Sequence, residues 1–238
     1  MRAYLMTMVG LVAACSGCGD DGGSVDASFT IDIDNASCGD TLHFTGEYVD
    51  WDTDVAFCGI ADATVDVEGD GATDTTAPNG RFDLCIPRTS PMTKLIVTQP
   101  SGNSQCSNPI SGYTVPTILF ANRDVILAGG FFSGRAFTTA RQATFFASAG
   151  ISFDSNKAQV FVHVNGTPHA VSLTAAHAPP QTIVATTWGA GDTGKEVFFP
   201  NVDVGSGTTT LTVAGGAIGA GNIPLIAGTI TNVSILIH

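Results

Sequence analysis

Two cysteines three positions apart, Cys15 and Cys18, are the residues whose types and spacing most directly suggest chemistry in this chain. Such a pair serves as a redox centre, as half of a zinc site, as disulfide partners or as a point of lipid attachment. The pair ends an N-terminal apolar run, and the sequence contains no second Cys-x-x-Cys that would complete a zinc site. Its position therefore favours processing of a leader over a redox or metal centre.

Residues 1–14 have the features of a secretory signal peptide. Met1-Arg2 carries one positive charge, residues 3–14 are uncharged and mainly apolar, and small residues precede Cys15. A helix made from this run would be about 18 Å long, which is shorter than the ~30 Å hydrocarbon core of a bilayer. We therefore expect a leader and not a membrane span.

Val12-Ala13-Ala14-Cys15 resembles the lipobox of bacterial lipoproteins. The resemblance implies that residues 1–14 are removed and that Cys15 carries acyl chains such as palmitate, which anchor the protein to a bilayer. Cleavage before Cys18 is an alternative, because it leaves an even number of cysteines. An ordinary secretory signal, with Cys15 lost, is another. We assign attachment to Cys15 and expect the bacterial cell envelope, preferably the outer membrane, with the folded part in the periplasm or on the cell surface.

Residues 15–40 are expected to form a lipidated tether, because Gly, Asp and Ser dominate its first part and bury little apolar surface. Four later cysteines, Cys38, Cys58, Cys85 and Cys106, predict disulfide bonds in an exported chain. The sequence leaves their three connectivities open. Strand alternation places Cys85 away from the apolar side of its strand, where a loop cysteine such as Cys106 or Cys58 is the easier partner.

The net charge of -12 repels phosphate backbones, so nucleic acid is not an expected partner. The G-x-S-x-G, H-E-x-x-H and S-x-x-K signatures of hydrolases do not occur in the sequence. We therefore assign no catalytic residue, no metal ligand and no cofactor, and we expect a protein that is not an enzyme.

From Thr41 the chain alternates apolar and polar residues in short segments separated by turns, which predicts an all-β fold. The segments TGEYVDWDTDVAFCGIADATVDVEG, TDTTAPNGRFDLCIP and KLIVTQPSG resemble the carboxypeptidase regulatory-like domains, which are transthyretin-like (prealbumin-like) β-sandwiches. Gly46 stands at the family's first-strand glycine. Asp74, Gly80 and Phe82 match its T-D-x-x-G-x-F signature, although five residues separate Asp74 from Gly80 where the family has two. The resemblance implies such a sandwich over residues 41–130.

Residues 131–238 are expected to form a second β-sandwich, either a diverged repeat of the first or an unrelated one. FFSGRAF matches LHFTGEY, and KAQVFVHVNG matches ADATVDVEG, although the copy needs a sizeable insertion before Gly194. The uncharged C-terminal run is rich in Gly and Asn and alternates in pattern, which favours terminal strands over a membrane span. The expected fold is thus two small Greek-key β-sandwiches in tandem, behind a signal peptide and a tether.

Three further groups of residues suggest binding chemistry. His163 and His169 flank a short turn and could form half of a metal site, although solvated strand positions explain them more simply. Two acidic runs have the spacing of calcium ligands but lack the final glutamate, which favours solvated turns. They are Asp50, Asp52, Asp54 and Asp66, Glu68, Asp70. We expect Trp51, which lies in an acidic loop, to be hard to bury. Aromatic residues could stack against sugars, with core packing as the default for the phenylalanine pairs. They are Tyr48, Trp51, Trp188, Phe131-Phe132, Phe145-Phe146 and Phe198-Phe199.

The sequence as a whole predicts a non-catalytic envelope lipoprotein whose β-sandwiches serve a structural role or bind a protein or a glycan. Its expected partners are the lipid bilayer, through the acyl anchor, and an envelope protein or glycan. One alternative is an envelope hydrolase, an esterase or glycosidase, with a site near His169 and His177 or among the acidic loops. A calcium-stabilised adhesion module is the other.

Overall fold

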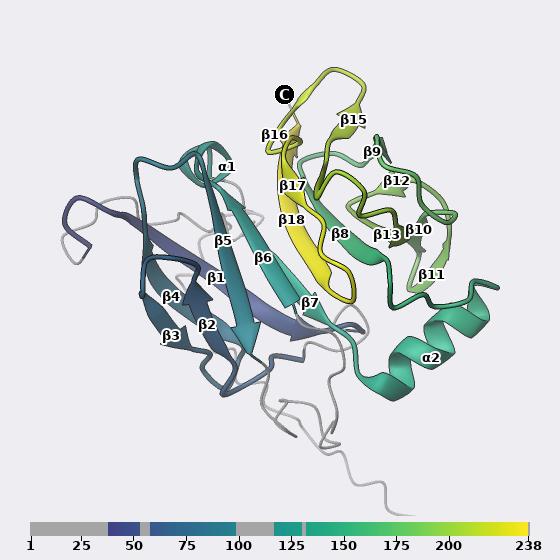
Figure 1. The fold of residues 1–238 in the computed structure, drawn as a ribbon, viewed down its shortest axis with the longest axis horizontal. Helices are drawn as coiled ribbons and strands as arrows, with labels where there is room; N and C mark the ends of the chain where they lie inside the picture. Colours follow the sequence, from purple (N-terminus) through teal and green to yellow (C-terminus); the bar gives the residue numbers. More distant parts are fainter. Residues whose placement is uncertain (1–37, 53–57, 99–116, 130–131, 238) are drawn as a thin grey trace, which may run out of the picture.

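The computed structural model describes residues 38–52, 58–98, 117–129 and 132–237 (Figure 1). Strands make up 51% of this part and helices 8%, with two helices among the described residues. The predicted all-β sandwich class is therefore confirmed. The leader, Cys15, Cys18 and most of the predicted tether lie outside the described residues, as do Asp54 and Cys106.

The first group of elements forms a sandwich around a hydrophobic core. The elements are β1 (Leu42–Asp50), β2 (Thr64–Val67), β3 (Thr73–Thr75), β4 (Arg81–Ile86), β5 (Met92–Thr98), β6 (Thr117–Asn122), α1 (Arg123–Leu127) and β7 (Ser133–Ala136). One layer is the sheet β4-β1-β7, and the other is the run β6-β5-β2-β3. Apolar residues of both layers meet in one buried cluster between them. In β4, for example, Phe82, Leu84 and Ile86 point inward, as alternation predicts.

The second group builds around three long strands. The elements are α2 (Thr139–Ser148), β8 (Ala158–Asn165), β9 (His169–Leu173), β10 (Gln181–Val184), β11 (Thr187–Ala190), β12 (Thr193–Gly194), β13 (Glu196–Val202), β14 (Thr208–Thr209), β15 (Leu211–Val213), β16 (Ala217–Ile218), β17 (Ile223–Pro224) and β18 (Ile230–Ile237). Both faces of the sheet β13-β8-β18 are covered. Residues of β9, β15 and β17 join the sheet in one buried cluster, and residues of α2 join it in another. Phe199 enters the first cluster and its neighbour Phe198 the second.

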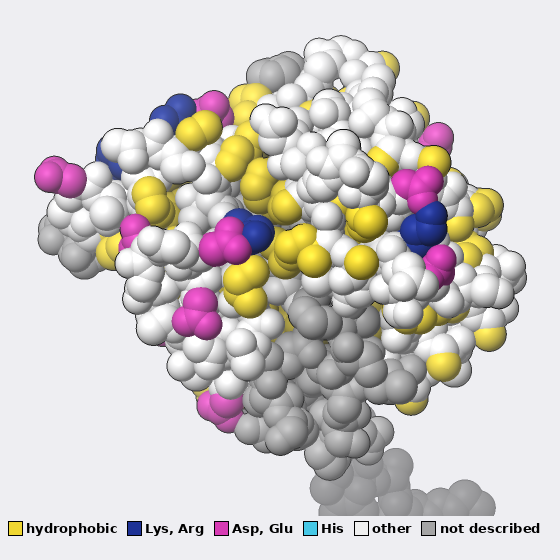
Figure 2. All heavy atoms as spheres, in the orientation of Figure 1, with side chains coloured by type: hydrophobic (Ala, Val, Ile, Leu, Met, Phe, Trp, Pro, Cys, Tyr) yellow, Lys and Arg dark blue, Asp and Glu magenta, His cyan; other side chains and the backbone are white. Residues whose placement is uncertain are grey.

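One ten-stranded sheet joins the two groups. The C-terminal strand β18 lies between β6 and β8 and runs parallel to both (Figure 1). In addition, β7 pairs in parallel with β1. The domain boundary predicted at residues 130–131 stays a prediction, and strand pairings cross it. Figure 2 shows hydrophobic side chains gathered over β5, β6 and β18, where the two groups meet. Neither described helix has the length and apolar character needed to cross a bilayer.

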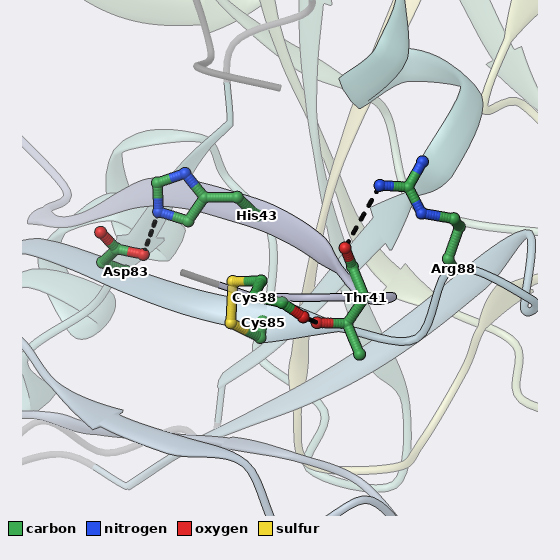
Figure 3. The surroundings of a disulfide bond; sticks show 6 residues. All are labelled: Cys38, Thr41, His43, Asp83, Cys85 and Arg88. Atoms are coloured by element: carbon green, nitrogen blue, oxygen red, sulfur yellow. Dashed lines mark hydrogen bonds and ion pairs between the residues drawn. A yellow bond between two sulfur atoms is a disulfide. The ribbon is translucent and has the colours of Figure 1, made fainter. Parts of the chain in front are cut away.

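A disulfide bond joins Cys38 to Cys85, with 5.5 Å between their Cα atoms (Figure 3). The prediction of a disulfide is confirmed, but the favoured partners of Cys85, Cys106 and Cys58, were wrong. A turn in front of β1 explains the difference: Thr41 donates from its backbone and its hydroxyl to the carbonyl of Cys38 and folds that cysteine back beside β4. Cys58 is also disulfide-bonded, and the described residues do not include its partner.

Candidate functional site

Trp51 organises a cluster of aromatic side chains at the end of β1. It is fully buried, so the expectation that its acidic loop would keep it exposed is wrong. Its ring stacks on Phe137 at 3.7 Å between centroids and meets Phe145 and Phe198 edge-on. Its backbone N–H donates to Ala136. Aromatic burial on three sides outweighs the preference of the neighbouring carboxylates for water.

Helix α2 covers this cluster with one face. Its N-cap is Thr138, whose hydroxyl accepts a hydrogen bond from the backbone N–H of Arg141 at 3.1 Å. Arg141, Phe145 and Ser148 follow at helical spacing and lie on one face. Phe145 is buried in the cluster, whereas Arg141 and Ser148 stay at the surface. The helix thus places a cation, an aromatic ring and a hydroxyl in one row.

The β10–β11 hairpin supplies the opposite side. Val184 pairs with Thr187 across a two-residue loop, and Ala185 in that loop adopts a φ of 60°, which is uncommon for a residue other than glycine. The hairpin carries Trp188, whose ring stacks on Trp51 at 4.9 Å between centroids and an interplanar angle of 23°. Trp188 is only half-buried, so part of its ring remains accessible beside α2.

Two adjacent pockets lie between α2 and the hairpin, two elements found at the right of Figure 1, and we treat them as the two lobes of one groove. Ser148 and Trp188 line both lobes, and we call the whole the Trp188 groove. The larger lobe has a volume of about 400 Å³ and is also lined by Asp52, Arg141, Ile183, Thr186 and Thr187. The smaller lobe has a volume of about 200 Å³ and is also lined by Phe145, Ala149, Gln181, Gly189 and Ala190.

A two-point ion pair lines the larger lobe. The Arg141 guanidinium donates from Nε to Asp52 Oδ2 at 2.6 Å and from Nη2 to Oδ1 at 2.9 Å. Asp50, two residues earlier, accepts from the backbone N–H of Asp52 and is itself buried. Burial raises the pKa of Asp50, and the charge of Asp52 adds to the effect, while the Asp52 N–H, Arg141 and Arg135 oppose it. Because the Asp52 carboxylate and the Arg141 guanidinium are paired, the two charges that face the groove cancel each other.

A buried polar row on the sheet supports the floor of the aromatic cluster. Arg135 donates from Nη1 to the carbonyl of Trp51 at 2.7 Å, and its Nη2 lies 2.5 Å from Glu196 Oε2. His163 Nδ1 lies 3.7 Å from Glu196 Oε1. Desolvation alone would raise the pKa of Glu196, but the His163 imidazole and the Arg135 guanidinium beside it lower the pKa below its ordinary range. Trp51 is thus fixed through its backbone to a buried ion pair.

The row also includes Ser234. This residue of β18 lies opposite His163 of β8, and His163 lies opposite Glu196 of β13. These residue types match those of a hydrolase triad. The side chain of Ser234 is buried, however, and its hydroxyl makes no hydrogen bond to any described residue. Because the Ser234 hydroxyl is buried, a substrate cannot reach it in this structure. We therefore interpret the row as a contact between neighbouring strands.

The other residues singled out from the sequence do not converge. His169 bonds to Thr167, and His177 bonds to the carbonyl of Ala178 and contacts the Phe199 ring. In the acidic runs, Asp52 pairs with Arg141 and Glu68 pairs with Lys94. Among the described residues, no cluster of three or more His, Cys, Asp or Glu side chains is arranged to hold a metal ion.

The residues singled out from the sequence include the aromatic members of the groove and Asp52 but not its other polar members. Sequence reasoning named Trp188 and Phe145, and the structure brings both together around Trp51. It missed α2 and therefore Arg141 and Ser148. A capping threonine before the helix-favouring residues TARQATFFAS was the available signal.

No protein-family model matches the chain, and no curated protein matches it either.

Proposed function

We propose that this protein is a lipid-anchored, non-catalytic binding protein of the bacterial cell envelope. The anchor is Cys15, with Cys18 as the alternative, joined to the folded body by the Gly/Asp-rich tether. The Val12-Ala13-Ala14-Cys15 lipobox after an apolar run supports this part of the proposal. A net charge of -12 disfavours nucleic acid as the ligand.

We also propose that the first half is a carboxypeptidase regulatory-like domain. Two signature positions make contacts that explain their residue types. Gly46 pairs with Phe82, and a Cβ at Gly46 would stand 2.4 Å from Phe82 Cζ, so the ring needs a glycine opposite it. Asp74 accepts the backbone N–H of Asp83 at 2.7 Å and ties the signature loop to β4.

The observation that carries the binding role is the Trp188 groove itself. Its described lining consists of aromatic and aliphatic side chains, hydroxyls, one amide and a neutralised Asp52–Arg141 pair, without a histidine or cysteine. Such a lining can hold a ligand by stacking and hydrogen bonding but offers no base or nucleophile poised for turnover. The hydrolase alternative rests on His169 and His177 or on the acidic loops. The two histidines are not part of that lining, and the one acidic residue that is, Asp52, is paired with Arg141.

Metabolic labelling with radioactive palmitate tests the anchor. Wild-type protein should incorporate label and enter the detergent phase of Triton X-114, whereas Cys15→Ser should lose both properties. Unchanged labelling of Cys15→Ser would contradict the assignment, and loss only in Cys18→Ser would move it to Cys18. Screening with ester and glycoside substrates tests the non-catalytic role, because turnover that His169→Ala abolishes would favour the hydrolase alternative.

A further inference from the structure

The Trp188 ring is presented as a fixed platform. One face rests on Trp51, and the ring also meets Phe145 edge-on at 5.7 Å between centroids. Because that face is covered, a ligand can reach only the rest of the ring, and Trp188 lines both lobes of the groove. Rigid aromatic surfaces bind with little loss of side-chain entropy.

The polar groups of the groove surround this platform. Asp52 and Arg141 lie at one end, with side chains 40% and 29% exposed, so both can reach a ligand. An arginine has five N–H donors, and the contacts with Asp52 use two of them. Ser148 and Thr187 donate to main-chain carbonyls, which leaves their oxygen lone pairs directed elsewhere as acceptors. The groove therefore offers donors and acceptors together around an apolar surface.

We propose that the Trp188 groove binds a neutral oligosaccharide, an inference that rests on the binding role proposed above. A sugar ring has a face of C–H bonds that can stack on Trp188 and a rim of hydroxyl groups that both donate and accept. Neighbouring hydroxyls can donate to the Asp52 carboxylate and accept from the Arg141 guanidinium. The mutual neutralisation of that pair leaves no net charge to attract an acidic sugar.

The size of the groove and the adjacency of its two lobes agree with a chain of sugar rings. The volume of the larger lobe, about 400 Å³, lies within the roughly 300–1,000 Å³ of small-molecule sites. The smaller lobe is adjacent to it, because Ser148 and Trp188 line both. A folded protein partner would instead need about 800 Å² of contact surface, which is far wider than a groove between one helix and one hairpin.

Isothermal titration of the folded protein with soluble tetrasaccharides tests this proposal. The probes are chitotetraose, cellotetraose and maltotetraose, with tetragalacturonate as the acidic comparison. We expect at least one neutral probe to bind, and Trp188→Ala to weaken its binding at least tenfold. Ser148→Tyr should do the same by filling the junction of the two lobes from the helix surface, without removing a ring from the core. Leu127→Ala, which removes an exposed apolar side chain from α1, should bind like wild type.

The outcomes separate this inference from the proposed function. If no neutral probe binds while palmitate labels Cys15, the carbohydrate inference is wrong and the anchored protein has a ligand of another class. Binding of tetragalacturonate alone would overturn the neutral preference. Undiminished binding in both Ser148→Tyr and a folded Trp188→Ala would place the sugar site outside the groove. Loss of labelling with sugar binding intact would overturn the anchor alone.

Discussion

The indole rings of Trp51 and Trp188 stack on each other at 4.9 Å between centroids, although 137 positions separate them in the sequence. This contact joins the end of β1 in the first sandwich to the β10–β11 hairpin. The two residues are also the only tryptophans of the chain. Trp51 supplies the buried support, and Trp188 supplies the surface that faces the groove.

Replacement of Trp51 tests this division of roles. Trp51→Ala should lower the free energy of unfolding by about 3–5 kcal/mol, because it removes a fully buried ring that contacts five of the described aromatic residues. Trp188→Ala should cost less, since that residue is only partly buried. Urea unfolding followed by circular dichroism measures both. An equal or larger loss for Trp188→Ala would contradict the assignment of Trp51 as the core residue.

The buried pair of Arg135 and Glu196 should show strong coupling. Arg135→Met alone should destabilise the protein by about 3–5 kcal/mol, because it leaves the Glu196 carboxylate buried without its main counter-charge. Adding Glu196→Met should restore part of that loss, since the double variant buries no unpaired charge. Urea unfolding of the two single variants and the double variant gives the coupling energy. Additive losses would show that the pair acts as two independent residues.

Stability should depend on pH in two opposite ways. Burial raises the pKa of Glu47 from 4.5, against the Ser133 hydrogen bond and nearby cations, and burial raises that of Asp50 from 3.8. The folded state thus binds these protons more readily, and the free energy of unfolding rises as the pH falls from neutrality through their folded pKa values. The pKa of Glu196 is lowered, so its contribution is present above pH 4.5 and is lost as the pH falls through its folded value.

The sum of these effects predicts maximum stability in the mildly acidic range. Unfolding by urea at a series of pH values measures the profile. Glu47→Gln should reduce the rise in the free energy of unfolding between neutral and mildly acidic pH, because the amide side chain takes up no proton. A free energy of unfolding that fell steadily below pH 7 would contradict the prediction.

The Cys38–Cys85 bond should stabilise the first sandwich. It closes a loop with a sequence separation of 47, for which chain entropy gives about 4 kcal/mol and typical disulfides give about 2–4 kcal/mol. The double variant Cys38→Ser/Cys85→Ser should lose stability of that order in thermal and urea unfolding. Peptide mapping without reduction checks the connectivity. A fragment that links Cys85 to Cys106 or Cys58 would refute the bond.

Gly80 should tolerate no side chain. It has a φ of 78°, and a Cβ there would stand 2.3 Å from the Tyr48 carbonyl oxygen. Gly80→Ala should therefore cost at least ~2 kcal/mol, from left-handed strain and a backbone clash together. Gly71→Ala is the matched control, because its φ is 83° but nothing lies within 4 Å of the added Cβ. Strain alone should cost it roughly 1–2 kcal/mol. Equal losses in the two variants would exclude the clash.

The all-β class and the alternation of β4 followed from the sequence because a strand repeats every two residues, and that period is visible in the residue types themselves. Residue type alone named Trp188 and Phe145 as candidates, but the acidic residues beside Trp51 left that residue on the surface. No local pattern shows that α2 and β13 close over Trp51, since burial there depends on contacts between distant segments.

By itself, the sequence determined the strand-rich class, the net negative charge and the lipobox resemblance, all of which are written in short stretches of residues. The tertiary structure alone decided that β18 lies between β6 and β8, that Cys85 bonds with Cys38, and that Asp52 meets Arg141. Each of these relationships joins residues that are at least 47 positions apart. Their geometry arises only when the sheets pack, because packing and not local propensity fixes which distant side chains meet.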